Sequence, residues 1–167
     1  MARDNASSEH REVEVVSFDQ SLAPHFESLN REWIEKDFVL EETDRQLFSD
    51  PAGQIVERGG QIFFVKWEGK VVGTCAVIPH GNEHFELAKM AVSENFQGQK
   101  IGNAMLDFAL RKSRELGADK VILYSNTILE PAIHLYRKYG FREVPVTNSL
   151  YKRSNIKMEI LISKLAD

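Results

Sequence analysis

Cysteine is almost absent from this sequence: Cys75 is the single one among 167 residues, so no internal disulfide can form, which fits a reducing compartment. No apolar run approaches the roughly 20 residues that a membrane-spanning helix needs, and the polar N-terminal residues lack the apolar core of a secretory signal. Acidic residues outnumber basic ones, 25 against 21, so the chain has no general attraction for nucleic acids or anionic membranes. We therefore expect a soluble cytoplasmic protein with no nucleic-acid or membrane partner.

The rest of the composition is that of an ordinary globular domain. Hydrophobic residues make up 43% of the chain and charged residues 28%. A chain of this length can bury one substantial core. Neither an internal repeat nor a low-complexity linker divides it. We expect residues 1–11 to form a flexible polar tail and residues 12–167 to form a single domain.

Apolar periodicity predicts strands that pair first as a hairpin and later alternate with helices. Glu68 and Gly69, between two apolar segments, are typical of a hairpin turn. Thr127 and Glu130 have the spacing of a capping box, which predicts a helix with Pro131 in its first turn. The expected strands are 13–18, 61–67, 70–79, 86–92, 120–125, 141–146 and 156–161, and the expected helices follow Asp19, Pro51, Lys100 and Thr127. This order predicts one α/β domain whose mixed sheet is covered by helices on both faces.

The junction between the strand that ends at Val92 and the helix that begins at Ile101 organises the rest of the chain. A helix N-terminus exposes N–H groups that have no intrahelical partner and carries partial positive charge, so it suits a phosphate or diphosphate. Gly98 and Gly102 would let such a ligand approach the backbone closely. Because short glycine signals are weak, spacing alone leaves a plain loop-to-helix connection equally open.

Two segments resemble signatures of the GCN5-related N-acetyltransferase (GNAT) family. Residues 97–102, QGQKIG, resemble its acetyl-CoA loop, usually Gln/Arg-x-x-Gly-x-Gly/Ala, with Lys100 where the middle glycine usually stands. Residues 132–141, AIHLYRKYGF, resemble its A-I-x-L-Y-x-x-x-G-F signature at the expected distance. Two ordered signatures are more specific than either alone. The resemblance covers roughly residues 13–161 and implies a GNAT-like fold, in which a mostly antiparallel sheet of about seven strands has a splayed central pair.

The resemblance also implies that acetyl-CoA is the cosubstrate. Its diphosphate needs backbone donors, and its peptide-like pantetheine arm can pair with the strand edge that ends at Val92. A backbone N–H near Met90 would hold the oxyanion of the thioester carbonyl, although Met90 and Val92 can be core residues at the same time. Asn126 either contacts pantetheine or caps the next helix. The candidate cofactor residues are Met90, Ala91, Val92, Gln97, Gly98, Gln99, Lys100, Ile101, Gly102, Asn103 and Asn126.

Acetyl transfer to an amine also needs acid–base groups. An alkyl ammonium of pKa about 10.4 is disfavoured as the free base near neutral pH by roughly 4 kcal/mol. Glu86, expected in phase with Met90, is the candidate base, with a solvated strand-end acid as the alternative and His84 as a weaker candidate. Tyr136 matches the family's general-acid tyrosine, which would protonate or hydrogen-bond the leaving thiolate. The alternative is a core aromatic residue.

The resemblance implies that the acceptor meets the thioester between the first helix–loop region and the last hairpin. The carboxylates between residues 37 and 44 would favour a cationic amine, although a solvated charged face is the alternative. Arg153 would suit an acceptor carboxylate, so an amino-acid-like amine would satisfy both walls, and a protein lysine is another candidate. The candidate acceptor residues are Asp37, Glu41, Glu42, Tyr151 and Arg153.

Direct attack in a ternary complex needs no covalent nucleophile, and Cys75 is expected in the core. No metal is expected, because His80 and His84 flank a turn without a supporting ligand cluster. One rival is a non-catalytic acyl-CoA-binding or sensing domain of the same fold. Another is a nucleotide-binding enzyme, but the glycines fit neither G-K-[ST] nor G-x-G-x-x-G. The expected partners are acetyl-CoA and an amine acceptor, with the chain a monomer or homodimer.

Overall fold

The structure is a computed structural model that describes residues 13–81, 84–98, 100–147 and 149–162. Within these ranges, seven strands form one sheet in the order β1-β2-β3-β4-β5-β7-β6. Its pairs are antiparallel except for β4 with β5. The strands are β1 (Val13–Ser17), β2 (Gln61–Trp67), β3 (Lys70–His80), β4 (His84–Val92), β5 (Lys120–Ser125), β6 (Arg142–Val144) and β7 (Ile156–Leu161). The predicted mixed, mostly antiparallel sheet is confirmed. The predicted tail, residues 1–11, lies outside the described residues.

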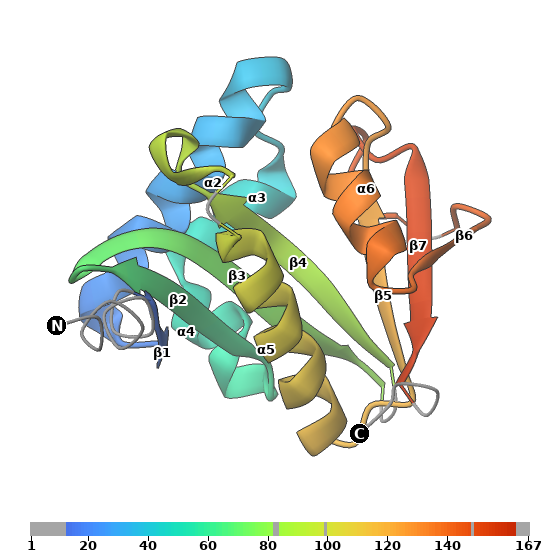
Figure 1. The fold of residues 1–167 in the computed structure, drawn as a ribbon, viewed down its shortest axis with the longest axis horizontal. Helices are drawn as coiled ribbons and strands as arrows, with labels where there is room; N and C mark the ends of the chain where they lie inside the picture. The colour runs from blue at the N-terminus through green and yellow to red at the C-terminus, as the bar shows by residue number, and fades with distance from the viewer. Residues whose placement is uncertain (1–12, 82–83, 99, 148, 163–167) are drawn as a thin grey trace, which may run out of the picture.

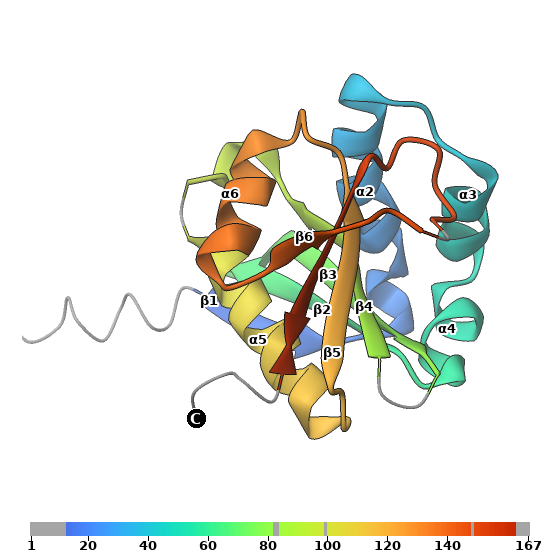
Figure 2. The ribbon, with the colours of Figure 1, turned by 90° about the vertical axis from the view of Figure 1, so that its right-hand side faces the viewer.

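Helices cover both faces of this sheet (Figure 1, Figure 2). Side chains alternate across a strand, so Phe63 and Phe64 of β2 enter two different apolar clusters. The cluster with Phe63 packs against Met105, and the one with Phe64 packs against Phe26. One face carries α2 (Ala23–Asp37), α3 (Glu42–Ser49) and α4 (Pro51–Gln54), and the other carries α5 (Ile101–Glu115) and α6 (Glu130–Lys138). The short 3-10 segments are η1 (Gln20–Leu22), η2 (Val56–Arg58) and η3 (Glu94–Phe96).

Local chemistry sets several of the turns. Glu68 and Gly69 both have positive φ, 48° and 81°, which is the backbone of a two-residue hairpin turn between β2 and β3. The predicted hairpin is therefore confirmed. Asp50 caps α4 by accepting a hydrogen bond from the N–H of Gly53 at 3.0 Å, and Gly59, at φ 92°, ends η2.

Two expected elements differ from those in the structure. The N-cap of α6 is Leu129, with no side-chain cap, so the predicted capping box at Thr127 is wrong. The Thr127 N–H instead donates to Asn155 Oδ1 at 2.9 Å, which ties it to the segment before β7. The expected strand 141–146 shortens to β6.

Helix α3 has no counterpart among the expected elements. Its capping box joins Glu41 and Asp44, and the Glu41 N–H donates to Asp44 Oδ2 at 2.9 Å. In the sequence these residues read as part of a charged segment. Two of its carboxylates are therefore used to begin a helix.

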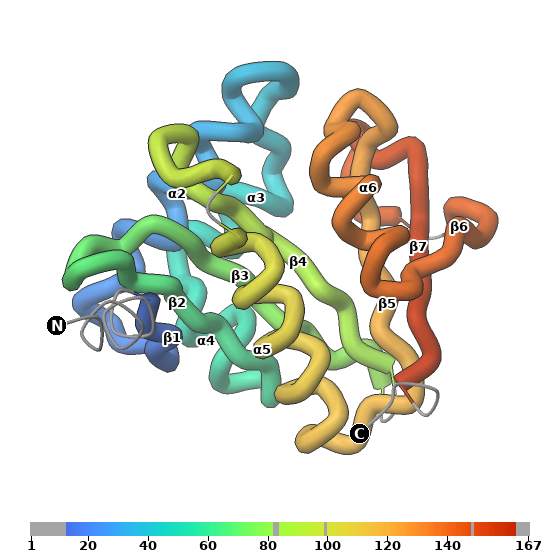
Figure 3. Tube along the Cα trace, viewed as in Figure 1, coloured from blue at the N-terminus to red at the C-terminus, as the bar shows by residue number. Residues whose placement is uncertain are grey.

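Strand β4 holds the features that position the site. It pairs with β5 only over His84–Glu86, and the two strands diverge beyond that point (Figure 1, Figure 3). On its other side, the pairing with β3 skips from Ala88 to Ala91 opposite the single residue Cys75, and Lys89 has φ 54°. This is a β-bulge, which places an extra residue in one strand. The predicted splayed central pair is confirmed.

Among the described residues, no helix combines the length and apolar character that crossing a bilayer requires.

Candidate active site

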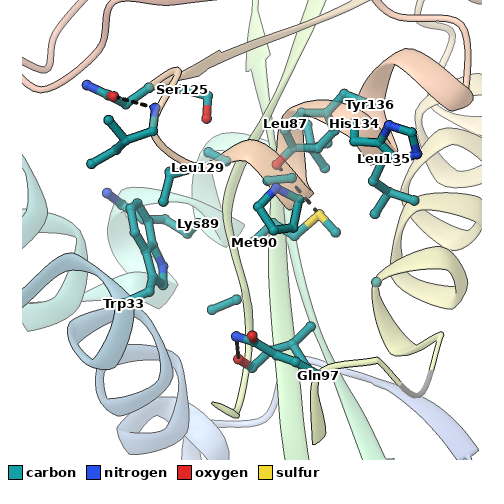
Figure 4. Close-up of a pocket in the computed structure, with 18 of the residues that line it drawn as sticks. Trp33, Leu87, Lys89, Met90, Gln97, Ser125, Leu129, His134, Leu135 and Tyr136 are labelled. Atoms are coloured by element: carbon teal, nitrogen blue, oxygen red, sulfur yellow. Dashed lines mark hydrogen bonds between the residues drawn. The ribbon is translucent and has the colours of Figure 1, made fainter. Parts of the chain in front are cut away.

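The divergence of β4 and β5 coincides with a cavity of about 740 Å³. Its walls come from the free part of β4, the loop before α5, the start of α5, helix α6, the end of β5, the end of α2 and the segment before β7 (Figure 4). Glu41 and Glu42 are not among its lining residues, and Gln99 lies outside the described residues. The predicted site residues that line the cavity are Asp37, Glu86, Met90, Ala91, Val92, Gln97, Gly98, Lys100, Ile101, Gly102, Asn103, Asn126, Tyr136, Tyr151 and Arg153.

The N-terminus of α5 opens on this cavity without a side-chain cap. Lys100 is its N-cap, with φ 61° and ψ 19°. This left-handed conformation favours glycine and costs other residues about 1 kcal/mol, so the family's usual glycine at this position has a backbone reason. The N–H groups at the start of α5 precede the first intrahelical bond, which Ala104 donates to the Lys100 carbonyl at 3.2 Å. They are the donors that a helix offers to an anion.

Gly102 stands where α5 approaches α6. A Cβ built there would lie 3.2 Å from Leu135 Cδ2 and 3.6 Å from Met90 Cε. Gly98, by contrast, has φ 84° and no neighbour within 4 Å of a built Cβ. Gly102 is therefore explained by close packing as well as by access to the backbone, whereas Gly98 is explained by its conformation.

Hydrogen bonds and an ion pair hold the loop between β4 and α5. Gln97 Nε2 donates to the Val92 carbonyl at 3.4 Å (Figure 4). The Glu94 N–H donates to Glu32 Oε1 at 2.8 Å, and the Glu94 carboxylate pairs with Lys36 at 3.1 Å. These contacts join the loop to the end of α2, so both elements bound the same cavity.

The bulge at Lys89 interrupts the alternation that the sequence predicts. Met90 packs with Leu87 in the cluster on the α5 face. Glu86 is paired with Ile78, which packs in the cluster on the α2 face. The expected phase of Glu86 with Met90 is therefore wrong, because the extra residue turns the strand between them. Both still line the cavity, which lies at the strand edge and is open to both faces.

Tyr136 is a buried residue of α6, 8% exposed. Its hydroxyl donates to Met90 Sδ at 4.0 Å (Figure 4), and its ring meets Phe141 edge-on. Burial raises the pKa of the Tyr136 hydroxyl, so the group stays protonated and can donate a hydrogen bond. Packing and hydrogen bonding are both available to this side chain.

Glu86 is buried, and its Oε1 lies 2.7 Å from His80 Nε2. The Glu86 side chain is 9% exposed and the His80 side chain 42%. Their hydrogen bond raises the pKa of His80, against the opposing effect of burial. Within the described residues, His80 provides the one hydrogen bond to the Glu86 carboxylate, so the second oxygen is without a donor.

Asp44 is the centre of a buried charge cluster. It accepts hydrogen bonds from Arg153 Nη1 at 2.6 Å and Nη2 at 2.8 Å, and a further one from Lys89 Nζ. Burial opposes ionisation of Asp44, but the Arg153 hydrogen bonds and the Lys89 charge outweigh it and lower its pKa to about 2. Burial lowers the pKa of Lys89 to about 8, against the attraction of Asp44.

The other candidate acceptor residues have separate environments. Glu41 accepts hydrogen bonds from the N–H groups of Lys152 and Arg153, at 2.8 and 3.2 Å. Glu42 is largely exposed, beside Arg45. Two cations lie near the ring of Tyr151: Lys89 Nζ is 4.3 Å and Arg153 Cζ is 4.5 Å from the ring centroid.

Asn126 uses its side chain within the protein. Its Nδ2 donates to the Arg153 carbonyl at 2.7 Å, and its Oδ1 accepts from the Ile128 N–H at 2.9 Å. The residue therefore joins the end of β5 to the segment before β7, as a turn-forming residue does.

Lys89 and Trp33 line the cavity but were missed from the sequence. Lys89 interrupts an otherwise apolar run, and that interruption was an available signal. Trp33 lies at helical spacing with core residues of α2, so the sequence contains no signal that distinguishes it as a cavity residue. No three His, Cys, Asp or Glu side chains within the described ranges are grouped so that they could hold a metal ion.

Comparison with known proteins gives consistent results. A family profile described as Acetyltransferase (GNAT) family matches residues 23–141. Mycothiol acetyltransferase of Propionibacterium freudenreichii subsp. shermanii is 31% identical over 97 residues, which are 57% of this chain and 29% of that relative. This chain thus spans less than a third of that relative's length.

Solved structures share the fold. A GNAT-family acetyltransferase from Staphylococcus aureus Mu50 superposes with a TM-score of 0.81 at 19% identity, covering 90% of this chain and 99% of that one. The PaiA N-acetyltransferase of Thermoplasma acidophilum, in complex with coenzyme A, has a TM-score of 0.70 at 15% identity, covering 89% and 98%.

Proposed function

The chain belongs to the GNAT acetyltransferase family, and from this premise we propose that it transfers the acetyl group of acetyl-CoA to a primary amine by direct attack. One observation carries the proposal. The free edge of β4, the uncapped start of α5 and the hydroxyl of Tyr136 all meet in one cavity. Acetyl-CoA laid along β4 would have its diphosphate at the start of α5 and its thioester sulfur near Tyr136.

Acetyl-CoA binding rests on backbone groups. The N–H groups of Ile101, Gly102 and Asn103 bind the diphosphate, and Lys100 and Lys138, which also line the cavity, add positive charge. The pantetheine arm pairs with β4 beyond Glu86, where no strand covers the β5 side. This is the mode in which an extended, peptide-like ligand adds to a sheet edge.

The chemical step follows from these placements. The neutral amine attacks the thioester carbonyl, and the Met90 N–H stabilises the negative charge that develops on the carbonyl oxygen. The C–N bond forms, the C–S bond then breaks, and the proton that the attacking nitrogen still carries passes to the departing thiolate, which leaves as the thiol. Tyr136 donates a hydrogen bond to the leaving thiolate, which lowers the barrier to its departure.

Before the attack, Glu86 accepts a proton from the ammonium form of the acceptor. It does so through the carboxylate oxygen that His80 does not contact. Because of the bulge at Lys89, Glu86 and Met90 reach the cavity from opposite faces of β4. The amine therefore approaches from the α2 side while the thioester lies on the α5 side. No residue has to act on both substrates.

A panel of primary amines tests this proposal. Wild-type protein is incubated with acetyl-CoA and each amine, and released CoA is measured with a thiol reagent. We expect turnover with at least one amine and an acetylated product of the matching mass. Binding of acetyl-CoA without turnover of any amine, peptides included, would favour a non-catalytic acyl-CoA-binding domain instead.

A further inference from the structure

The acceptor end of the cavity has a charge balance that the sequence does not reveal. Two basic side chains line it, Lys89 and Arg153, and both are nearly buried, with 2% and 10% of their side chains exposed. Each donates to the same fully buried carboxylate, Asp44. Arg153 holds it with both terminal nitrogens, at 2.6 and 2.8 Å.

A ligand carboxylate would have to compete with Asp44 for these cations. Asp44 is held in place, because it also accepts a hydrogen bond from the Glu41 N–H in the capping box of α3. Its pKa of about 2 keeps it charged at neutral pH. A second carboxylate brought beside it would meet like charge in a desolvated site, where such juxtaposition is strongly unfavourable. Arg153 therefore neutralises the protein's own acid and is not a receptor for an acid on the acceptor.

Two carboxylates that line the cavity can attract a cation. Glu86 is buried and has one carboxylate oxygen without a donor among the described residues. Asp37, at the end of α2, adds a further carboxylate to the wall. Trp33 and Tyr151 add aromatic surface to the same cavity, which can bury an apolar group.

We infer that the acceptor is a cationic primary amine carried on an apolar or aromatic body with no carboxylate beside the amine. This inference rests on the proposed acetyl transfer and narrows its substrate. The ammonium group enters toward Glu86, which takes its proton, and the body of the molecule lies against Trp33 and Tyr151. An amino-acid-like acceptor, which Arg153 suggested from the sequence, is disfavoured because Asp44 already holds that guanidinium.

Matched amine pairs test the inference. Phenethylamine and phenylalanine differ by one carboxylate beside the amine, as do tyramine and tyrosine. We expect kcat/KM for the amine without the carboxylate to exceed that for its partner by about a hundredfold in both pairs. Equal values, a preference for the carboxylate-bearing member, or turnover confined to peptides would overturn the inference while leaving acetyl transfer in place. Absence of CoA release with every amine would remove the proposed function and the inference together.

A change of specificity provides the sharper test. Asp44→Asn frees both cations, so the ratio of kcat/KM for phenethylamine to that for phenylalanine should fall at least about tenfold. Because this change disturbs a buried ion pair, Glu41→Gln serves as the milder variant; Glu41 lies 3.5 Å from Arg153 Nη1. The control is Glu42→Gln, an exposed residue of α3 outside the cavity. An unchanged ratio in both folded variants contradicts the inference.

Discussion

At the scale of single residues, the surroundings of Tyr136, which lines the cavity, and of His80, which contacts Glu86, change the protonation of both side chains. Burial keeps the Tyr136 hydroxyl protonated by raising its pKa. The pKa of His80 is also raised, but here the charged form is favoured, because the imidazolium forms a hydrogen bond with the Glu86 carboxylate. Under the proposed function, Tyr136 is a permanent donor toward the thioester, and Glu86 is a carboxylate whose pairing with His80 depends on pH.

Replacement of the Tyr136 hydroxyl should affect turnover more than binding. In Tyr136→Phe the ring still packs against Phe141, and only a 4.0 Å contact to Met90 Sδ is lost. We expect kcat to fall about a hundredfold with acetyl-CoA affinity nearly unchanged, measured by steady-state kinetics and calorimetry. Tyr139→Phe is the control on the same helix. Wild-type turnover in Tyr136→Phe would leave Tyr136 a packing residue.

The charge of His80 should shape the pH profile of the reaction. Below its pKa the imidazolium pairs with the Glu86 carboxylate and competes with the substrate's ammonium for it; above that pKa the pairing charge is gone. The charge of Lys157 acts against the imidazolium, and His84 is paired with His80 across the two strands. In His80→Gln we expect the acid limb of kcat/KM, followed between about pH 5 and 9, to move to lower pH.

His84→Gln is the matched control for this measurement, since His84 is an exposed residue of β4 outside the cavity. The contribution of the amine's own ionisation is common to all three proteins. A profile for His80→Gln that coincides with the wild type would show that His80 has no influence on the base.

At the scale of elements, α5 is the helix to which the proposed function assigns the diphosphate. It begins in a left-handed residue, Lys100, and has no side-chain cap, so its first N–H groups are available to a ligand at the cost of a less stable helix end. Helix α3 is the opposite case, because Glu41 and Asp44 form its capping box and the same Asp44 anchors Arg153. One helix start is left open for binding, and the other is closed by the protein's own acids.

A negative charge placed at the start of α5 should repel the diphosphate. Gly102→Glu and Gly102→Gln introduce side chains of nearly equal size, so both meet Leu135 at the same close approach. The glutamate alone opposes the cofactor's charge. We expect its acetyl-CoA dissociation constant to exceed that of Gly102→Gln by about tenfold, measured by calorimetry. Equal affinities of the two variants would argue against diphosphate binding at this helix.

At the scale of the whole molecule, the splay of β4 from β5 divides the sheet into two parts that share one cavity. Helices α2 and α5, which contact β3 and β4, and helix α6, which follows β5, all line this cavity (Figure 1, Figure 4). A ligand that bridges the two parts should stabilise the folded chain, because it binds the native state alone.

Thermal unfolding measures this bridging. At a concentration about 100 times its dissociation constant, CoA should add roughly 2.7 kcal/mol of stability, which raises the Tm of a domain of this size by about 5–10 °C. ATP and NAD, tested at the same concentration, should give little shift, because they lack the pantetheine arm that pairs with β4. A larger shift with either nucleotide would favour a nucleotide-binding enzyme.

Sequence alone determined the features that depend on neighbouring residues. The hairpin at Glu68-Gly69, the strand–loop–helix order around Gly98 and the helix that carries Tyr136 follow from local periodicity and turn chemistry. These signals also identified the family, since its two signatures are contiguous stretches. The resulting fold prediction was correct in sheet composition and in the splayed pair.

Tertiary structure alone decided the pairing of charges and the direction of side chains. Arg153 and Asp44 are 109 positions apart, and no local pattern tells an arginine that is free for a substrate from one that a distant acid holds. The bulge at Lys89 depends on the register of β4 against β3, which skips two residues opposite Cys75, so strict alternation put Glu86 on the wrong face. The capping box at Thr127 failed for the same reason, because Asn155 takes its N–H. Periodicity describes a strand in isolation, whereas the chemistry of this cavity depends on what the strand is packed against.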